Sequence, residues 1–387
     1  MAAHALLSAS GASRWIACPP SARKEAEKPD QESSYAAEGT TAHELAEIEL
    51  IEKVPDLRIE RNEYLSRRAD IEMNQYYCPE MNDYIEEYTD AVNERFSTAK
   101  QMDPAAIISL EERLDYSRWI PEGFGTGDVV MVYKNTIEVI DLKYGKGVQV
   151  FADHNPQMKL YALGALDRYE MLYELDTVVM TIMQPRLDHI STFEMPVEEL
   201  IQWAEEVAKP AAELAYKGEG EYRAGEHCKF CKIKATCRAR ADANLKLAAY
   251  DFQDPAELDP DELAAILEKA SELQAWVSDI QAYALDQAEN YGVKFPGFKL
   301  VEGRSNRKYT DDEAVAGTLL EAGYDESKIY EKKLLGITKM EKEVGKKAVK
   351  ELLSDLVIKP PGKLTLVPLD DKRPEVNSSE AAAADFK

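Results

Sequence analysis

The sequence predicts an α/β fold, of the α+β kind, in which a central mixed sheet is flanked by helices. The first observation is a pair of largely apolar, β-branched runs at 129–133 and 136–140, separated by Lys134-Asn135. Such a pattern predicts a two-residue turn, in which Asn tolerates positive φ. The second observation is that strand-like runs at 107–114 and 177–183 alternate with stretches of helical periodicity.

The chain is long enough, at 387 residues, to bury a large core and to form two or three domains. Its C-terminal end consists of small and polar residues and includes a run of four alanines, a composition that favours disorder. The expected parts are a helical part at 1–105 that carries Cys18 and His43, a core at 106–210, a cysteine segment at 211–245, a mainly helical accessory domain at 250–371 and a disordered tail at 372–387.

A helix is expected to begin after Asn155, which can cap it while Pro156 takes the first position. Gln157 and Tyr161 are then four residues apart and lie on one helical face. The same pattern also fits an ordinary amphipathic helix whose tyrosine belongs to the core. Two further helices are expected, at 197–216 and 256–291.

Asp128 and Asp141 fall opposite one another in the predicted hairpin. Counting outward from the turn, Val130 faces Val139, so the two acids face each other two residues further out. Directly opposed side chains lie roughly 5 Å apart on one face of a sheet. Lys143 lies on that face as well, because strand side chains repeat every two residues.

Two opposed carboxylates are unfavourable unless one is protonated or a cation lies between them. Mg²⁺ or Mn²⁺, which prefer oxygen ligands, suit such a pair. An ammonium group beside the ion can orient a water or stabilise charge on a phosphate, an arrangement that suits phosphodiester hydrolysis. The alternative is a solvent-exposed strand end that carries two unrelated acids.

Upstream, Thr40 or Thr41 is expected to cap a helix that has His43 in about its first turn. Taken alone, His43 fits a surface or core histidine as well as a metal ligand. Glu111 and Glu112 are adjacent in the strand-like run, and strand phase decides which one faces the acid pair.

Five cysteines give an independent signal; they are Cys18, Cys78, Cys228, Cys231 and Cys237. The last three follow a C-x2-C-x5-C pattern, which predicts metal ligation by thiolates rather than disulfides. Zinc and an iron–sulfur cluster both use such ligands, and each needs a fourth. Cys18 can supply it, or His227 for zinc; reduced structural thiols are the third interpretation. Cys78 is expected to be a bystander.

The formal net charge of −25 argues against simple binding to nucleic acid, but the charge is uneven. Residues 223–240 carry a net charge of +5, residues 294–308 carry +4, and the rest of the chain carries −34. Basic islands on an acidic body fit a protein that holds a polyanion in one place and repels it elsewhere. They also fit ordinary solvated surface charges. With no apolar run of membrane-spanning length, we expect a cytoplasmic protein.

Several motifs together resemble the RecB-like branch of the PD-(D/E)XK nuclease superfamily. The resemblance rests on Gly125-Thr126-Gly127-Asp128, on Ile140-Asp141-Leu142-Lys143, on the Gln157 to Tyr161 spacing and on His43 upstream. Within that branch, relatives with a [4Fe–4S] cluster join one early cysteine in a Cys-Pro element to three late ones. The resemblance covers roughly residues 7–240, and the whole chain also resembles an uncharacterised phage and prophage family with this core.

The resemblance implies a restriction-endonuclease-like core with Mg²⁺ or Mn²⁺ held by His43, Asp128, Asp141 and the Leu142 carbonyl. It implies that Lys143 positions or activates the attacking water. Gln157 and Tyr161 are expected to position substrate, and Glu111 corresponds to an acidic position of some relatives. A [4Fe–4S] cluster is expected on the four cysteines Cys18, Cys228, Cys231 and Cys237. The sequence departs from the family pattern in having Thr126-Gly127 in place of proline before the first acid, and aspartate rather than glutamate at 141.

The function so implied is a metal-dependent deoxyribonuclease, a phage-type exonuclease that resects DNA ends for recombination or repair. DNA is the expected partner, with a phage single-strand annealing or binding protein as a candidate second one, in the cytoplasm of a bacterial host. Two alternatives come from other classes. One is a non-catalytic DNA-binding or scaffolding subunit on a nuclease fold, and the other is an iron–sulfur redox protein.

Overall fold

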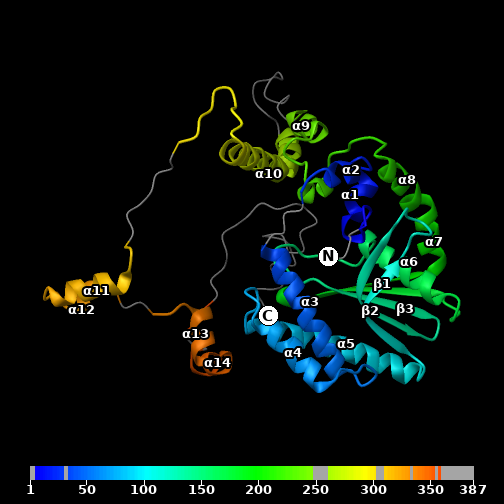
Figure 1. The fold of residues 1–387 in the computed structure, drawn as a ribbon, viewed down its shortest axis with the longest axis horizontal. Coiled ribbons are helices and arrows are strands. Elements are labelled where there is room, and N and C mark those ends of the chain that lie inside the picture. Colours follow the sequence, from blue (N-terminus) through cyan, green and yellow to red (C-terminus); the bar gives the residue numbers. More distant parts are fainter. Residues whose placement is uncertain are drawn as a thin grey trace. The chain divides into compact units, whose positions relative to one another are not determined.

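The computed structural model describes residues 5–29, 34–246, 260–301, 309–331, 334–353 and 356–358 (Figure 1). The chain forms two compact units, Met1–Ala284 and Leu285–Lys387. The predicted N-terminal helices, sheet and cysteine segment all belong to the first unit. None of the helices formed by the described residues is long and apolar enough to cross a membrane.

The first unit is built on a five-stranded mixed sheet, as the sequence predicts. Its strands pair in chain order, antiparallel throughout except for the parallel pair of the third and fourth strands. The strands are β1 (Ile107–Asp115), β2 (Phe124–Tyr133), β3 (Thr136–Leu142), β4 (Thr177–Gln184) and β5 (His189–Pro196).

The hairpin of β2 and β3 has the predicted register, with Val130 opposite Val139 and Tyr133 opposite Thr136. The expectation about the turn is wrong in one respect. The residue with positive φ is Lys134, at +50°, and not Asn135. The two strands fix the turn length and hence the backbone conformation, so a lysine accepts a conformation that asparagine adopts more easily.

Helix α6 (Pro156–Tyr169) makes the crossover between β3 and β4 that a parallel pair requires. The predicted cap is confirmed: the Asn155 side chain accepts hydrogen bonds from the backbone N–H groups of Gln157 and Met158 at 3.0 and 3.4 Å. Proline takes the first helical position. The crossover helix therefore begins beside the end of β3, close to where Asp141 lies.

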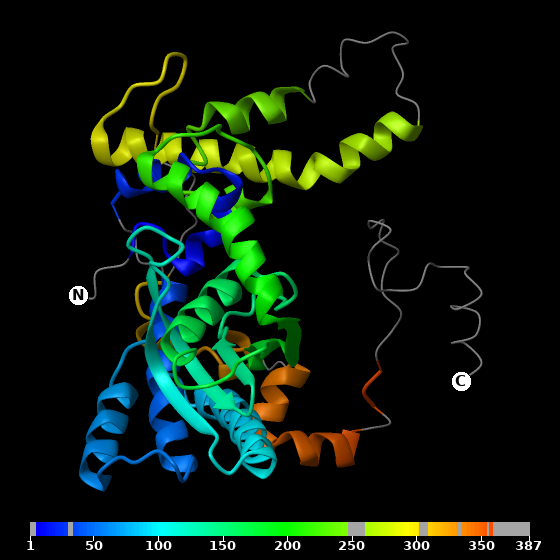
Figure 2. The ribbon, with the colours of Figure 1, turned by 90° about the vertical axis from the view of Figure 1, so that its right-hand side faces the viewer.

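Helices cover both faces of the sheet, and alternate strand residues enter two separate cores. Val130 and Val139 belong to the core formed with α6, whereas Val129 and Ile140 belong to the core formed with α3 and α5. Figures 1 and 2 show the blue and cyan helices α3–α5 on one side of the sheet and the green helix α6 on the other. The helices of the second core are α3 (Ser34–Lys53), α4 (Arg61–Glu72) and α5 (Glu80–Met102).

Helix α3 begins earlier than predicted, at Ser34, so Thr40 and Thr41 are not caps. Their hydroxyls instead donate to the carbonyls of Ala36 and Ala37, four residues back. Such bonds let threonine lie inside a helix. His43 is consequently in the middle of a long, well-supported helix rather than in a first turn that can fray.

Short N-terminal helices and the segment after β5 complete the first unit. The predicted helix at 197–216 forms, but it contains a π-helical turn at Ala204–Ala208 just before Pro210, whose missing N–H interrupts the regular hydrogen bonding. The remaining elements of the unit are η1 (Ala9–Gly11), α1 (Ala12–Ala17), α2 (Ser21–Ala26), η2 (Pro185–Leu187), α7 (Val197–Trp203), α8 (Lys209–Lys217), η4 (Glu226–Phe230) and α9 (Arg238–Leu245).

Helix α10 (Pro260–Tyr291) confirms the long helix predicted after the cysteine segment and extends into the second unit. The rest of that unit contains the short helices α11 (Asp312–Glu321), α12 (Glu326–Ile329), α13 (Ile337–Val344) and α14 (Lys346–Leu353). Residues 302–308 of the second basic island and the predicted tail at 372–387 lie outside the described residues.

Gly164 allows α6 to approach β1 closely. A Cβ atom at this position would lie 2.8 Å from the Leu114 Cβ and 3.0 Å from the Leu114 carbonyl carbon. We expect Gly164→Ala to lower the free energy of unfolding by about 1–3 kcal/mol, because backbone cannot move aside as a flexible side chain can. Denaturant unfolding measures the change. Gly39→Ala is the matched control, since an added Cβ there meets nothing within 4 Å; a loss of stability no larger than in this control would contradict the packing argument.

Candidate metal centre

Three side chains from three elements meet beside the hairpin. One donor atom each from His43 on α3, Glu111 on β1 and Asp128 on β2 lie within 4.8 Å of one another. The His43 Nδ1 is 3.3 Å from the Asp128 Oδ1, and the other oxygen of Asp128 accepts a hydrogen bond from the Leu142 N–H at 2.7 Å. One nitrogen and several carboxylate oxygens form a donor set that a divalent cation accepts.

In β1 the regular alternation of side chains between the two faces of the sheet is interrupted at Glu111. This change of strand phase explains how the Glu111 side chain reaches the centre. Ser109 and Glu112 both bond the Tyr169 hydroxyl, at 3.2 and 2.9 Å, although they are three residues apart. In a regular strand such residues point to opposite faces. The phase changes at Glu111, which has a φ of +45°, an uncommon conformation for a residue other than glycine.

The neighbouring strand changes phase at the facing position. An added Cβ on Gly127 would meet the side chains of Leu114 and Val130, so Gly127 and Val130 face the same core although they are three residues apart. Asp128 lies between them. The β1–β2 register is continuous on both sides, from Leu110 opposite Val129 to Glu112 opposite Gly127. The irregularity therefore turns Glu111 and Asp128 toward His43 without shifting the rest of the sheet.

The choice between the two adjacent glutamates is settled by this geometry. Glu111 joins the centre. Glu112 is 8 % exposed and lies on the α6 side, where it pairs with Arg168 and accepts from the Tyr169 hydroxyl.

Asp141 lies at the end of β3 and is enclosed by groups from the predicted motif. Its side chain is only 3 % exposed, and its Oδ2 is 2.9 Å from the Lys143 Nζ. The Gln157 Nε2 donates to its Oδ1 at 3.1 Å and lies 3.3 Å from the Tyr161 hydroxyl. The structure thus brings together Asp141, Lys143, Gln157 and Tyr161. Gly125 makes room for this group, because an added Cβ would lie 2.7 Å from the Tyr161 ring.

The charges of the centre act strongly on one another. Glu111 is exposed at one side, but partial desolvation and the Asp128 carboxylate still raise its pKa to about 7. Burial opposes protonation of His43, but the nearby carboxylates, Asp128 first, outweigh it and raise its pKa to about 9. Burial raises the pKa of Asp141, and the Lys143 ammonium opposes that rise. The pKa of Lys143 is raised in turn, because Asp141 outweighs its desolvation.

The predicted ligand set and the observed grouping overlap without being identical. His43 and Asp128 belong to both. Glu111 joins the three-residue group, whereas Asp141 is engaged by Lys143 and Gln157. The Leu142 backbone adjoins Asp128 through its N–H, which donates to the Oδ2 of that carboxylate.

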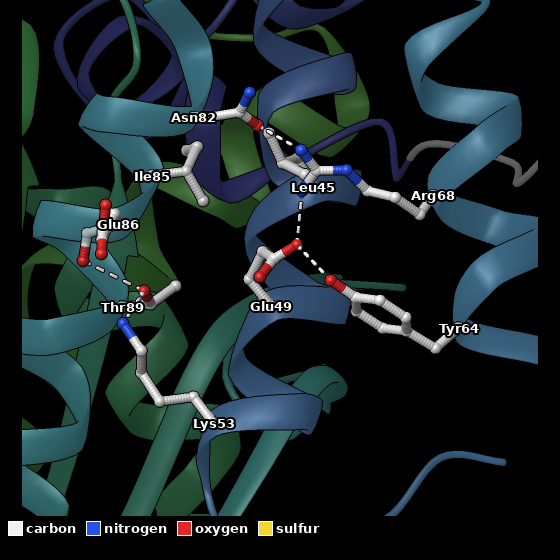
Figure 3. Close-up of a pocket in the computed structure, with 9 residues that line it drawn as sticks. All are labelled: Leu45, Glu49, Lys53, Tyr64, Arg68, Asn82, Ile85, Glu86 and Thr89. Carbon is white, nitrogen blue, oxygen red and sulfur yellow. Dashed lines mark hydrogen bonds and ion pairs between the residues drawn. The ribbon is translucent and has the colours of Figure 1, made fainter. Parts of the chain in front are cut away.

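A polar cavity of about 350 Å³ between α3, α4 and α5 shows how the helix that carries His43 is held (Figure 3). Glu49 of α3 points into it and accepts hydrogen bonds from Tyr64 and Arg68 of α4, at 2.9 and 2.5 Å. Arg68 also bonds Asn82 of α5. The Glu49–Arg68 ion pair and the bonds to Tyr64 and Asn82 therefore join the three helices across the cavity. Glu47, one turn after His43, pairs with Arg67 in the same way.

The four predicted cluster ligands, which lie far apart in the sequence, line a single small pocket. Its walls include Cys18, Cys228, Cys231 and Cys237 together with His227. One hydrogen bond joins the N-terminal segment to the cysteine segment, because the Glu25 carboxylate accepts from the Lys232 N–H at 2.8 Å. Arg14 of the N-terminal segment holds that carboxylate in place at 3.0 Å. Cys78, the predicted bystander, is not among the residues that line this pocket.

The thiols of this pocket are in unusual environments. Burial raises the pKa of Cys231 to about 11. At Cys228 burial acts the same way, but hydrogen bonds from His227 and the Gly225 N–H lower the pKa overall. The His227 Nε2 donates to the Arg223 carbonyl at 2.8 Å. Four thiols and one imidazole around one pocket fit the donor chemistry of either an iron–sulfur cluster or zinc.

The first basic island has two kinds of side chain. Lys234 and Arg240 form ion pairs with Asp279 of α10, at 2.7 and 2.6 Å, and Arg240 is 2 % exposed, so these two are structural. The exposed basic residues of the island are Arg223, Lys229, Lys232 and Arg238. The exposed Phe230 lies among them, with the Lys229 ammonium 5.5 Å from its ring centre.

Sequence reasoning missed the role of Glu25, whose spacing from the cysteines carries no local signal, and the phase change that turns Glu111. The positive φ of Glu111 could not be predicted from the sequence, because glutamate rarely adopts this conformation and only contacts with distant segments impose it here. It also missed Tyr88 of α5, which is 2 % exposed and has an unpaired hydroxyl.

The raised pKa of Glu111 predicts how the cation-free protein responds to pH. Its carboxyl group binds a proton more tightly in the folded chain, with a pKa of about 7 against 4.5. The contribution of Glu111 to stability therefore falls as the pH rises from about 4.5 to 7. At about pH 8, with chelator present, we expect Glu111→Gln to melt roughly 2–4 °C above the wild type, a difference of about 1 kcal/mol after allowing for solvent screening. Calorimetry should show this gap closing near pH 4.5; a variant that melts lower at pH 8 would contradict the assignment.

Comparison with known proteins identifies the family of the chain. A solved structure titled "Crystal structure of SSO0001" matches 52 % of this chain and 96 % of that chain, at 15 % identity and a TM-score of 0.20, which is too low to carry an argument. A family model described as "Protein of unknown function (DUF2800)" matches residues 4–374. The chain belongs to the DUF2800 family.

Proposed function

We propose that the protein is a divalent-cation-dependent deoxyribonuclease of the PD-(D/E)XK type, RecB-like branch. The observation that carries this proposal is the convergence of His43, Glu111 and Asp128 beside the Asp141–Lys143 ion pair. Chain segments from α3, β1, β2 and β3 meet there. A group of carboxylates without a cation is electrostatically unfavourable, as the raised pKa values of Glu111 and Asp141 indicate.

The side chains present fit a divalent cation at this centre. His43, Glu111 and Asp128 would hold it, with Asp141 and the Leu142 carbonyl as the additional ligands that the sequence motif implies. Mg²⁺ or Mn²⁺ would supply Lewis-acid stabilisation of the negative charge that develops on the scissile phosphate. Once a dication neutralises the carboxylates, their repulsion no longer favours protonation, so all of them can remain ionised at neutral pH.

Lys143 remains an ammonium ion in this environment, because the Asp141 carboxylate raises its pKa. An ammonium ion does not accept a proton. Its role is therefore to orient the attacking water and to stabilise the charge on the phosphate oxygens. Asp141 fixes the position of the ammonium group at 2.9 Å, and Gln157 fixes Asp141 from the other side.

Gln157 and Tyr161 support the centre from α6. The side-chain amide of Gln157 donates to both the Asp141 carboxylate and the Tyr161 hydroxyl, so hydrogen bonds connect the three side chains. Burial raises the pKa of Tyr161, which keeps its hydroxyl protonated as a donor. These groups hold the acid in a fixed orientation and present polar atoms to a substrate at the same point.

DNA is the proposed substrate, for a reason of charge as well as motif. The chain carries a net charge of −25, so it repels a polyanion over most of its surface. The exposed lysines and arginines at 223–238 form a basic patch on this acidic chain, and Phe230 stands exposed among them. Exposed cations around an aromatic ring suit contact with phosphates and bases.

A [4Fe–4S] cluster on Cys18, Cys228, Cys231 and Cys237 is proposed as a structural cofactor, and a single zinc ion is the alternative. The four thiols share one pocket, which supports either group. A cluster there would link α1 to the segment before α9 and so restrict the unfolded chain.

The proposed biological role is to act on DNA ends in a phage or prophage setting, and it is drawn by analogy with the family that the sequence resembles.

The first test of this function is hydrolysis of linear and covalently closed DNA with and without Mg²⁺. We expect Asp141→Asn to reduce the Mg²⁺-dependent rate by on the order of 10²–10³-fold, because it removes the partner that fixes Lys143 and one negative charge of the centre. The matched control is Asp167→Asn, a partly exposed acid on α6 that pairs with Arg118 and should leave the rate unchanged.

Resistance of the closed circle would indicate an exonuclease, and cutting of both substrates an endonuclease. Activity that survives Asp141→Asn would contradict the proposed chemistry. A wild type that hydrolyses DNA with none of the divalent cations would also contradict it, and would favour the non-catalytic DNA-binding subunit.

The second test concerns the cysteine pocket. Anaerobically purified protein should contain about four irons and four sulfides per chain. Cys18→Ser should lose most of them and melt at a lower temperature, whereas Cys78→Ser should keep both properties of the wild type. One zinc per chain and no sulfide would indicate a zinc site in place of the cluster. A wild type that contains no metal and melts at the same temperature as Cys18→Ser would contradict both the cluster and the zinc site.

A further inference from the structure

Tyr88 has a buried polar atom that the protein itself does not satisfy. The residue lies on α5, its side chain is 2 % exposed, and its hydroxyl has no hydrogen-bond partner among the described residues. A buried hydroxyl without a partner is destabilising, and such groups are normally satisfied by ordered water. Tyr169, another buried tyrosine, contrasts with it, since its hydroxyl contacts both Ser109 and Glu112.

The surroundings of Tyr88 place its ring on the α3 side of the sheet. It packs in the core between α3, α5 and the sheet, together with Ala42, which precedes His43, and Val129, which follows Asp128. The side chains of Glu111 and Asp128 turn to the same side, toward His43. The ring therefore lies on the face of the sheet where His43, Glu111 and Asp128 meet.

Electrostatics agree with this placement. After burial, the carboxylates that raise the pKa of Tyr88 most are Asp128, Asp141 and Glu111, in that order. The phenol therefore stays protonated and is available as a donor. No direct hydrogen bond joins it to these oxygens among the described contacts, so a bridging group of the size of a water molecule is the simplest way to satisfy both sides.

We propose that Tyr88 donates a hydrogen bond to a buried water that in turn donates to the Asp128 carboxylate, and that Tyr88 is thereby a positioning residue for a divalent cation at His43, Glu111 and Asp128. The inference rests on the proposed cation site but does not depend on DNA hydrolysis. The water lies between the phenol and the acids, so it limits how the Asp128 carboxylate can rotate. A fixed carboxylate binds a cation more tightly than one that must be ordered on binding.

The test is Tyr88→Phe, measured by Mn²⁺ titration of the full chain with electron paramagnetic resonance and without DNA. We expect the Kd for Mn²⁺ to rise roughly tenfold, as for loss of an outer-shell partner. The cation-free variant should melt at about the same temperature as the wild type, because it keeps the packed ring and loses only one hydrogen bond to the buried water. This combination separates a positioning role from general loss of packing.

Tyr169→Phe is the matched control on the opposite face of the sheet. It should melt lower, because Glu112 loses a buried donor, and should bind Mn²⁺ like the wild type. An unchanged Kd in Tyr88→Phe, or a wild type that binds no Mn²⁺, would overturn the inference. A weakened Kd in a protein that never cleaves DNA would support Tyr88 and reject the hydrolase, so the two failures are distinguishable.

Discussion

The structure depends on one electrostatic constraint: three carboxylates and a histidine are held together where β1, β2 and β3 converge with α3. Separated in water, Glu111, Asp128 and Asp141 would all be ionised. Here burial and mutual repulsion raise the pKa of Glu111 and Asp141, and His43 gains a proton in compensation. A cation would remove the repulsion without requiring any of these protons, and this is the basis of the proposed cation site.

The rest of the first unit can be understood as the support for this constraint. A phase change in two paired strands turns Glu111 and Asp128 toward α3, while the ladder on either side keeps its register. The cavity of paired charges ties α3 to α4 and α5 and so fixes the helix that carries His43. On the opposite face, Gly164 lets α6 approach the sheet, and the Asn155 cap begins that helix where Gln157 can reach Asp141.

Local patterns in the sequence were sufficient for the hairpin, its register, the Asn155 cap and the pairing of Gln157 with Tyr161. Each depends on residues close in the chain, and a period of two or 3.6 determines the outcome. The start of α3 was misplaced because Thr40 and Thr41 are favourable caps but also bond within a helix. Glu111 and Tyr88 could not be assigned, since a strand irregularity and an unpaired hydroxyl follow from packing between distant segments. The cysteine spacing predicted a site on the three late cysteines, the family resemblance added Cys18, and all four line one pocket.

The central claim is that a divalent cation occupies the space between His43, Glu111 and Asp128. The most direct measurement is a crystal structure of the protein grown with Mn²⁺, with diffraction recorded at the manganese absorption edge. The account predicts an anomalous peak within about 2–2.6 Å of oxygen and nitrogen atoms of these three side chains. An absence of anomalous signal there at saturating Mn²⁺, with the side chains placed as they are here, would contradict it.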